Sequence, residues 1–118
     1  MKIESRIFSV ADYARPSEGE PIRSVVLETA ESVIVVWYLR PGQEIAAHVH
    51  PHGQDTWTVL SGSAEYFQGN GIVCNLKANE VAVAKPGQVH GAKNVGSEPF
   101  VFVSVVASGN AGYALAEK

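Results

Sequence analysis

Short runs of β-branched residues, each closed off by Gly, Pro or Asn, are the feature that most constrains the fold of this chain. Nine such runs follow one another from residue 22 at short and nearly regular intervals. Runs of about four to eight residues of this kind are typical of β-strands, and many of them in succession indicate a sandwich or a barrel. The predicted strands cover 22–28, 33–39, 44–49, 56–60, 64–68, 72–76, 81–84, 89–94 and 100–106.

The composition also favours an all-β chain. Seventeen Val and six Ile stand against five Leu, and there are eleven Gly and six Pro. β-Branched residues fit pleated strands, whereas Gly and Pro favour turns. The strongest turn signal is Gly69-Asn70-Gly71, which separates two apolar runs. Because Gly and Asn adopt positive φ at little cost, a β-hairpin is expected there.

A length of 118 residues corresponds to one domain. Residues 11–20 combine a short helix-compatible turn with Pro and Gly, which predicts an N-terminal arm over 1–21. The predicted strands place a barrel over 22–107. The C-terminal tail, 108–118, has little apolar content, and we expect it to fray or to dock as a short helix.

Charge and hydropathy exclude several classes of partner. The net charge is -3 and the nine Lys and Arg form no run, so nucleic acid and anionic membrane surfaces are poor partners. No segment reaches the roughly 20 apolar residues that span a bilayer, and the first ten residues lack the apolar stretch of a signal peptide. A small molecule or another protein chain remains as the expected partner.

The single cysteine, Cys74, cannot form a disulfide within the chain, which excludes a disulfide-stabilised secreted scaffold. A lone Cys in a β-branched run is expected to be a small buried side chain inside a strand. Together with the missing signal peptide, this predicts a cytoplasmic protein.

Histidine carries the clearest chemical signal. The chain has four, and three of them, His48, His50 and His52, lie within five residues. Side chains alternate between the two faces of a strand, so His48 and His50 project from the same side. Asp55 shares a face with Trp57 on the next run, and His90 lies on a later one.

Imidazole nitrogens combined with a carboxylate suit a divalent transition metal. Four such ligands leave one or two coordination positions open, as Lewis-acid or oxygen chemistry requires. An isolated His-x-His pair in a β protein is also compatible with ordinary hydrogen-bonded histidines. However, burying several neutral imidazoles without partners costs a few kcal/mol, which favours a bound ion.

The spacing of these residues resembles the two motifs of the cupin family. The first motif matches through its glycines, its two histidines and its acidic position, which is usually Glu and is Asp55 in this chain. The second has Asn79 where Gly is usual and Lys85 where Pro is usual. Including these departures, the residues at the motif positions are Gly42, His48, His50, Asp55 and Gly62 in the first motif, and Asn79, Lys85-Pro86-Gly87, His90 and Asn94 in the second.

The resemblance implies a double-stranded β-helical barrel, or jelly roll, with one internal metal site and usually a homodimeric assembly. Carried over by position, it implies one divalent transition metal per chain, which could be Fe, Mn, Ni, Co, Cu or Zn. Its implied ligands are His48, His50, Asp55 and His90.

Asp55 reaches one methylene less far than Glu, so direct binding, binding through water and no binding all stay open. Gln54 competes with Asp55 as the fourth ligand, since related small cupins can place a ligand four residues after the second His. The two residues have opposite parity, so only one of them should point at the metal. The six-residue interval to Gly62 favours Asp55.

Other polar residues near the motifs have two interpretations each. His52 lies in a predicted loop, where it is either a solvated imidazole or a residue that shuttles protons. Lys85 and Lys93 flank His90, and either receive an anionic substrate or are solvated surface residues. Trp57 lines the barrel beside the metal or fills the core. Turn and backbone geometry, rather than chemistry, is assigned to Gly42, Gly62, Gly87 and Asn94.

Two functions follow from the resemblance. The first is a metal-dependent enzyme of the dioxygenase, isomerase or decarboxylase type, acting on a small polar or aromatic molecule. The second is a non-catalytic module that binds or senses a small ligand. A storage role is poorly supported, because storage cupins are generally larger, two-domain chains. No G-x-S-x-G motif is present in the sequence, which argues against covalent acyl chemistry.

Overall fold

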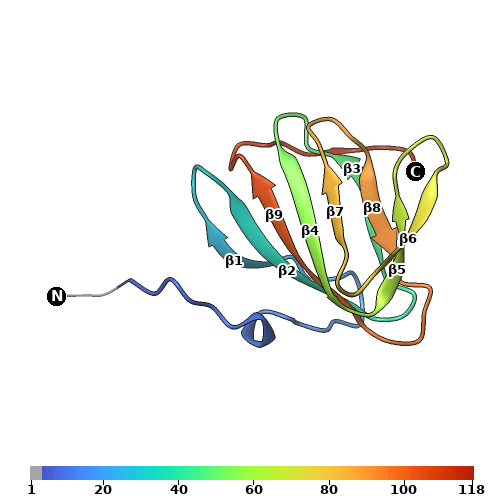
Figure 1. Ribbon diagram of the computed structural model, residues 1–118, viewed down its shortest axis with the longest axis horizontal. Helices are drawn as coiled ribbons and strands as arrows, with labels where there is room; N and C mark the ends of the chain where they lie inside the picture. The colour runs from blue at the N-terminus through green and yellow to red at the C-terminus, as the bar shows by residue number, and fades with distance from the viewer. Residues whose placement is uncertain (1–3) are drawn as a thin grey trace.

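The computed structural model describes residues 4–118 and folds them as two five-stranded antiparallel sheets that enclose a common interior (Figure 1). One sheet has the order β1-β2-β9-β4-β7 and the other the order β10-β3-β8-β5-β6. Non-consecutive neighbours in both sheets make this the predicted jelly roll. The strands are β1 (Ser24–Glu28), β2 (Val33–Leu39), β3 (Glu44–Val49), β4 (Gln54–Ser61), β5 (Ser63–Phe67), β6 (Val73–Lys77), β7 (Val81–Ala84), β8 (His90–Lys93), β9 (Phe100–Ala107) and β10 (Ala114–Leu115).

All nine predicted strands are present, three of them with the predicted bounds and the others within two residues. The hairpin joins β5 to β6, with Phe67 opposite Val73 and Asn70 at a φ of 55°. In the N-terminal arm, the helix-compatible turn is a 3-10 helix, η1 (Val10–Asp12). In Figure 1 the arm runs away from the barrel.

The C-terminal tail differs from its prediction. Instead of fraying or forming a helix, it crosses one end of the barrel and adds β10 to the second sheet (Figure 1). Leu115 lies opposite His48, and the amide of Ala116 donates a hydrogen bond to the carbonyl of Ala47. Pairing with β3, which local sequence does not reveal, decides the conformation of this segment.

An irregularity in β3 sets which of its side chains face the interior. Against β8, Ile45 is opposite Ala92 and His48 is opposite His90. Over this interval β3 therefore contains one residue more than β8. Such a bulge reverses the alternation of the strand. Ile45 before the bulge and His48 after it are therefore both buried, although an unbroken strand would turn one of them outward.

Gly91 on β8 is packed against this bulge. A Cβ at position 91 would lie 2.7 Å from the carbonyl oxygen of Ile45 and 3.0 Å from the carbonyl of Ala46. Only glycine leaves room for the backbone of β3 at this distance. The close approach of the two strands brings His48 beside His90, with ring centroids 4.1 Å apart.

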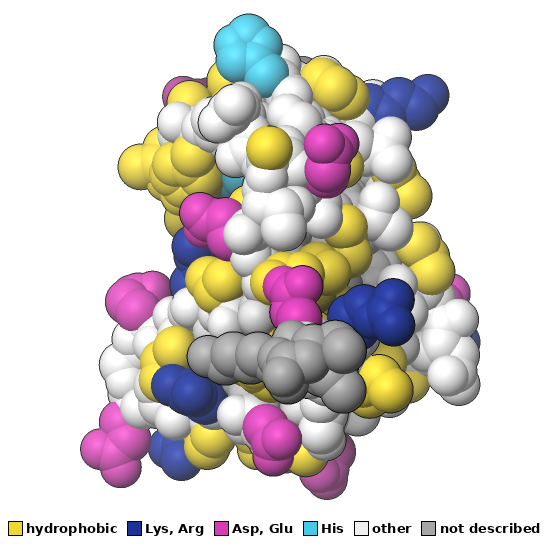
Figure 2. All heavy atoms as spheres, turned by 90° about the vertical axis from the view of Figure 1, so that its left-hand side faces the viewer, with side chains coloured by type: hydrophobic (Ala, Val, Ile, Leu, Met, Phe, Trp, Pro, Cys, Tyr) yellow, Lys and Arg dark blue, Asp and Glu magenta, His cyan; other side chains and the backbone are white. Residues whose placement is uncertain are grey.

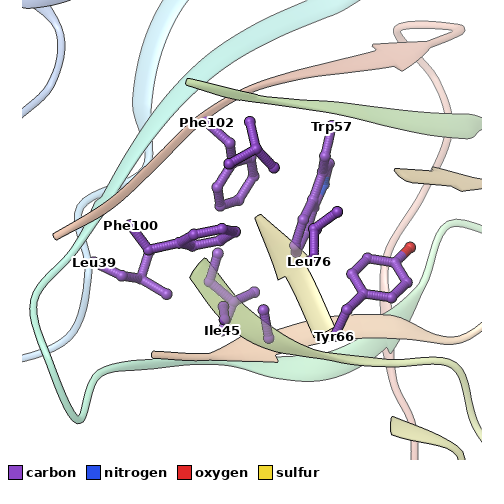
Figure 3. Packing of buried hydrophobic residues seen from close by; sticks show 10 residues of the cluster. Leu39, Ile45, Trp57, Tyr66, Leu76, Phe100 and Phe102 are labelled. Atoms are coloured by element: carbon purple, nitrogen blue, oxygen red, sulfur yellow. The ribbon is translucent and has the colours of Figure 1, made fainter. Parts of the chain in front are cut away.

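The hydrophobic core packs between the strands inside the barrel (Figure 3). Trp57 stacks on Phe102 with a centroid separation of 4.1 Å and meets Tyr66 edge-on at 5.3 Å. Aromatic pairs of this geometry contribute roughly 0.5–1.5 kcal/mol beyond the area they bury. Trp57 also meets the ring of His90 edge-on, at a centroid separation of 5.9 Å, so the core adjoins the histidines. Its members are Leu39, Ile45, Trp57, Val59, Ala64, Tyr66, Leu76, Ala92, Phe100 and Phe102.

The prediction of a buried Cys74 was wrong. Cys74 does lie in a strand, β6, but its side chain is exposed. β6 is the outer strand of the second sheet, and Leu76 is its one buried residue. A strand at the edge of a sheet contacts a neighbour on one side only, so more of its side chains reach solvent.

The surface carries both signs of charge. Figure 2 shows acidic and basic side chains interspersed among apolar ones on the face that carries the N-terminal arm. This face has no field of one sign that would attract a polyanion. None of the helices in residues 4–118 has the length and hydropathy of a membrane span.

Candidate metal centre

Four side chains from three parts of the chain converge at one end of the barrel interior. His48 lies on β3, His50 directly follows it, Asp55 lies on β4 and His90 on β8. One potential ligand atom from each lies within 4.8 Å of the others. His48, Asp55 and His90 are at most 5% exposed, and His50 is partly buried. The sequence predicted this set of four.

Backbone carbonyls hold each imidazole in one tautomer. Nδ1 of His48 lies 2.7 Å from the carbonyl oxygen of Ala46, and Nδ1 of His90 lies 3.1 Å from that of Gln88. Nδ1 of His50 lies 2.6 Å from the carbonyl oxygen of Gly112. A carbonyl oxygen can only accept, so each Nδ1 carries the proton and donates it. Every neutral ring then turns an unprotonated Nε2 away from the backbone.

The two oxygens of Asp55 have separate contacts. Oδ1 accepts a hydrogen bond of 2.6 Å from the hydroxyl of Ser104 on β9. Oδ2 lies 3.0 Å from Nε2 of His90 and 3.3 Å from Nε2 of His50. Ser104 therefore holds the carboxylate so that its other oxygen faces the histidines.

These contacts leave a cluster of electron-pair donors. With their protons on Nδ1, the neutral imidazoles direct Nε2 lone pairs toward one region, and Asp55 adds a carboxylate oxygen there. Lone pairs and a carboxylate repel one another unless a proton or a cation lies between them. The donor set of three imidazoles and one carboxylate is one that divalent transition metals prefer. Hydrogen bonds from the far side of each ring are also the usual surroundings of metal-binding histidines.

The pKa values reflect the same geometry. Burial, together with neighbouring His90, lowers the pKa of His48 to about 4. When His50 is doubly protonated, its Nε2–H donates to Asp55, and this hydrogen bond is the main reason that the pKa of His50 is raised, while burial and the charge of Arg23 oppose this effect. Burial alone would raise the pKa of Asp55, but the contacts of its Oδ2 with His50 and His90 and the hydrogen bond from Ser104 outweigh it and lower the pKa well below its usual range. Asp55 is thus an anion at neutral pH.

A cavity of about 480 Å³ opens beside the cluster, and His48, His50 and Asp55 form part of its lining. The other walls are mainly apolar and come from β2, β9 and the C-terminal tail. A ligand here would contact the cluster and an apolar surface together. The remaining residues that line the cavity are Arg23, Val33, Val35, Trp37, Ile45, Trp57, Ser104, Val106, Gly109, Ala111, Gly112 and Tyr113.

A larger groove of about 840 Å³ lies elsewhere, along the β5–β6 hairpin and the C-terminal end. Its lining is more polar and includes none of the four clustered side chains. The smaller cavity is therefore the one that combines enclosure with candidate chemistry.

The C-terminal tail closes one side of the candidate site. The carbonyl of Gly112 accepts the hydrogen bond from His50, and the ring of Tyr113 lies 5.0 Å from that of His48. Ala111 is buried against Gly53, where a Cβ on the glycine would clash with the alanine side chain. At the end of the tail, Lys118 pairs with Glu44 at 2.7 Å. The tail is thus fastened at both ends across the cavity.

The alternatives left open by the sequence have different outcomes. Gln54 is exposed and its amide contacts Thr56. It therefore lies on the opposite face of β4 from Asp55, as the alternation of side chains predicted. His52 is exposed in its loop. Lys85 and Lys93 are both exposed and neither lines the cavity, which favours the solvated interpretation. Trp57 belongs to the core, as one interpretation predicted, and it also lines the cavity beside the four clustered side chains.

Sequence reasoning missed four residues that the structure places at the site: Arg23, Ser104, Gly112 and Tyr113. Ser104 left a detectable signal, because it follows Phe100 and Phe102 at period two on the inner face of β9. The other three come from segments before β1 and after β9, where no strand pattern indicates what they contact.

Residues 35–106 match the family model of the cupin domain. The chain belongs to the cupin family. A solved cupin-like structure, of an uncharacterized conserved protein with a double-stranded β-helix domain from Klebsiella pneumoniae subsp. pneumoniae MGH 78578, is 77% identical. The match covers 98% of this chain and 100% of that chain, with a TM-score of 0.95.

A more distant solved structure shows a likeness of the fold alone. The TT1209 structure from Thermus thermophilus is 23% identical, with a TM-score of 0.82 over 88% of this chain and 98% of that one. Among curated proteins, mannose-1-phosphate guanylyltransferase RfbM of Salmonella typhimurium is 28% identical over 67 residues. That match spans 57% of this cupin but only 14% of the transferase.

Proposed function

We propose that this cupin is a metal-dependent enzyme that binds one divalent transition metal through His48, His50, Asp55 and His90 and acts on a small molecule in the adjoining cavity. One observation carries the proposal: three Nε2 lone pairs and one carboxylate oxygen point toward one another at the edge of an apolar cavity. A bound cation would relieve their repulsion. Four protein ligands would leave one or two positions for substrate or oxygen.

The residues around the proposed ion have distinct roles. When bound, the ion would supply Lewis-acid polarisation of a substrate oxygen or, if it is redox-active, oxygen chemistry. The carbonyls of Ala46, Gly112 and Gln88 keep the three rings in the ligating tautomer, and Ser104 orients Asp55. The apolar side chains of Val33, Val35 and Val106 line the space beside the cluster and would limit the access of water there.

A second candidate is a binding module in which the ion orients a ligand without turnover. It is favoured by the sparse acid–base chemistry of the cavity: apart from the clustered residues, its only ionisable lining side chains are Arg23 and Tyr113. Reactions of the dioxygenase, isomerase or decarboxylase type would then depend on the ion itself for activation. Recovery of a tightly bound ligand without chemical change would support the module.

Elemental analysis of purified, untagged protein tests the metal site. Wild type should contain close to one transition-metal ion per chain, and His48→Ala, Asp55→Ala and His90→Ala should contain far less. His52→Ala is the matched control, because His52 is an exposed histidine outside the cluster. Metal content well below one per chain in wild type, or equal content in all variants, would reject the assignment.

Turnover is tested separately with protein reconstituted with Fe, Mn, Ni, Co, Cu or Zn in turn. Oxygen uptake and product formation would be followed with phenolic, diketone and dicarboxylate compounds. Consumption that requires both the ion and His90 supports an enzyme. Binding without consumption for every compound supports the module instead.

We further propose a cytoplasmic homodimer. An exposed thiol at Cys74 suits a reducing compartment. β1 is the edge of its sheet and exposes Val25 and Leu27, while Ile7 in the arm is 90% exposed. Apolar side chains on an open edge favour association with another chain. Light scattering after size-exclusion chromatography tests this, since a mass of 12.6 kDa would mean a monomer.

A further inference from the structure

The lining of the cavity beside the histidine cluster combines three chemically different parts. One side is the cluster itself, the walls are aliphatic and aromatic, and the remaining charged side chain is Arg23. Asp55 is the one carboxylate in the lining, and its oxygens are already taken by Ser104 and the histidines. The lining therefore includes one cationic side chain, Arg23, and no carboxylate that forms an ion pair with it.

Arg23 lies just before β1 and is exposed at the cavity. Among residues 4–118, the ion pairs involve His50, His90 and Lys118, and none involves Arg23. Its guanidinium lies near enough to His50 to act on that ring electrostatically. A ligand that reaches the histidine cluster could therefore also reach Arg23.

The geometry points to Arg23 as the residue that selects the ligand: a small aliphatic or aromatic molecule that carries a carboxylate. This inference rests on the proposed function, because it names the substrate class of the same cavity. A guanidinium presents a planar fork of donors that matches a carboxylate in two parallel hydrogen bonds. The apolar walls receive the body of the molecule.

The choice of a carboxylate over a more highly charged anion follows from the surroundings. Arg23 is the one cation in the cavity lining, and the negative charge of Asp55 lies in the same cavity. A phosphate group would bring up to two charges to a single guanidinium and face that carboxylate. Lys85 and Lys93, which could have added positive charge, lie outside the cavity.

Calorimetric titration of zinc-loaded protein with benzoate and with its neutral isostere benzamide tests this inference. Wild type should bind benzoate more tightly than benzamide. In Arg23→Gln, benzoate binding should weaken roughly tenfold, the loss of one charge-assisted pair at a solvent-accessible site. Arg23→Lys should retain part of that affinity, since it keeps the charge but loses the fork.

Two controls separate the role of Arg23 from other effects. Arg40→Gln removes the same charge from an exposed position outside the cavity and should leave benzoate binding unchanged. Benzamide binding should be equal in wild type and Arg23→Gln. The inference is overturned if wild type does not bind benzoate, or if Arg23→Gln binds it within about twofold of wild type, a difference of only ~0.4 kcal/mol.

The same titration with metal-free protein distinguishes failure of this inference from failure of the proposed metal site. If zinc does not bind stoichiometrically but benzoate binding still depends on Arg23, the metal site is wrong and the carboxylate preference stands. If zinc binds to the histidine cluster and benzoate affinity is the same in wild type and Arg23→Gln, the metal site stands and the carboxylate preference is wrong.

Discussion

Ser104 on β9 donates a hydrogen bond to Oδ1 of Asp55 on β4, over 2.6 Å, and both residues are buried. Together with the contacts of Oδ2 with His50 and His90, it keeps Asp55 ionised despite burial. It also fixes the direction of Oδ2, the oxygen that faces His50 and His90. The orientation of the carboxylate thus depends on a side chain from a different strand.

Ser104→Ala should weaken zinc binding by about 10- to 100-fold, the usual effect of removing a group that orients a metal ligand. The free energy of unfolding of the metal-free protein should fall by about 1–3 kcal/mol, because a buried carboxylate loses a donor. Competition with a chromophoric chelator measures the first effect, and urea unfolding measures the second. Ser61→Ala, at the exposed end of β4, should change neither. Equal zinc affinity in Ser104→Ala and wild type would show that Ser104 does not orient a ligand.

The hydrogen bond from His50 to the carbonyl of Gly112 predicts that the C-terminal tail contributes to metal affinity. Deleting residues 111–118 should weaken zinc binding by about 10- to 100-fold, since one imidazole loses the acceptor that orients it. Circular dichroism should still report a folded β protein, because the core residues all lie before position 103.

Deleting only residues 117–118 is the matched control for the tail. It removes the ion pair of Lys118 with Glu44 but leaves Gly112 in place. Exposed ion pairs contribute at most about 1 kcal/mol, so zinc affinity should stay close to wild type. Equal losses in the two deletions would mean that docking of the chain end, rather than Gly112, controls His50.

The lowered pKa of His48 predicts a loss of stability in mild acid for metal-free protein. The ordinary pKa is 6.5 and the folded value is about 4, so protonation disfavours the folded state. This contribution to stability is complete above pH 6.5 and is lost as the pH falls from 6.5 toward 4, on the order of 3 kcal/mol in all. The raised pKa of His50 acts in the opposite direction, adding stability that is present below pH 6.5 and lost at higher pH.

Comparison of wild type with His48→Gln isolates the contribution of His48. Urea unfolding in the presence of a chelator, at pH 7.5, 6 and 5, should show that wild type loses stability relative to the variant as the pH falls. His52→Ala, which removes an exposed histidine, should follow wild type. A difference between wild type and His48→Gln that stays constant over this range would contradict the prediction.

The approach of β8 to the bulge of β3 predicts a strict requirement for glycine at position 91. Gly91→Ala would place a Cβ 2.7 Å from the carbonyl oxygen of Ile45, so the strands must separate. We expect a loss of about 1–3 kcal/mol in the free energy of unfolding, together with weaker zinc binding as His48 moves from His90. Gly19→Ala, where no atom lies within 4 Å, is the control. Wild-type stability in Gly91→Ala would mean that the bulge tolerates displacement.

Much of the fold was predictable from local pattern. The β-branched runs predicted nine of the ten strands, because alternation and turn residues act over a few neighbours along the chain. The same parity argument put His48 with His50 and separated Asp55 from Gln54, as the structure has them. Cys74 and the C-terminal tail were mispredicted, because their surroundings depend on which strands lie at the edges of the sheets.

The sequence by itself determined that this chain is an all-β cupin and that four particular side chains could share one point. Period-two alternation says that His48 and His50 share a face, but not which face turns inward. The bulge of β3 against Gly91 decided that, because one extra residue reverses the alternation. The tertiary structure also decided the positions of Ser104, Gly112 and Arg23 around the cluster, since contacts between distant segments form only when the two sheets close on each other.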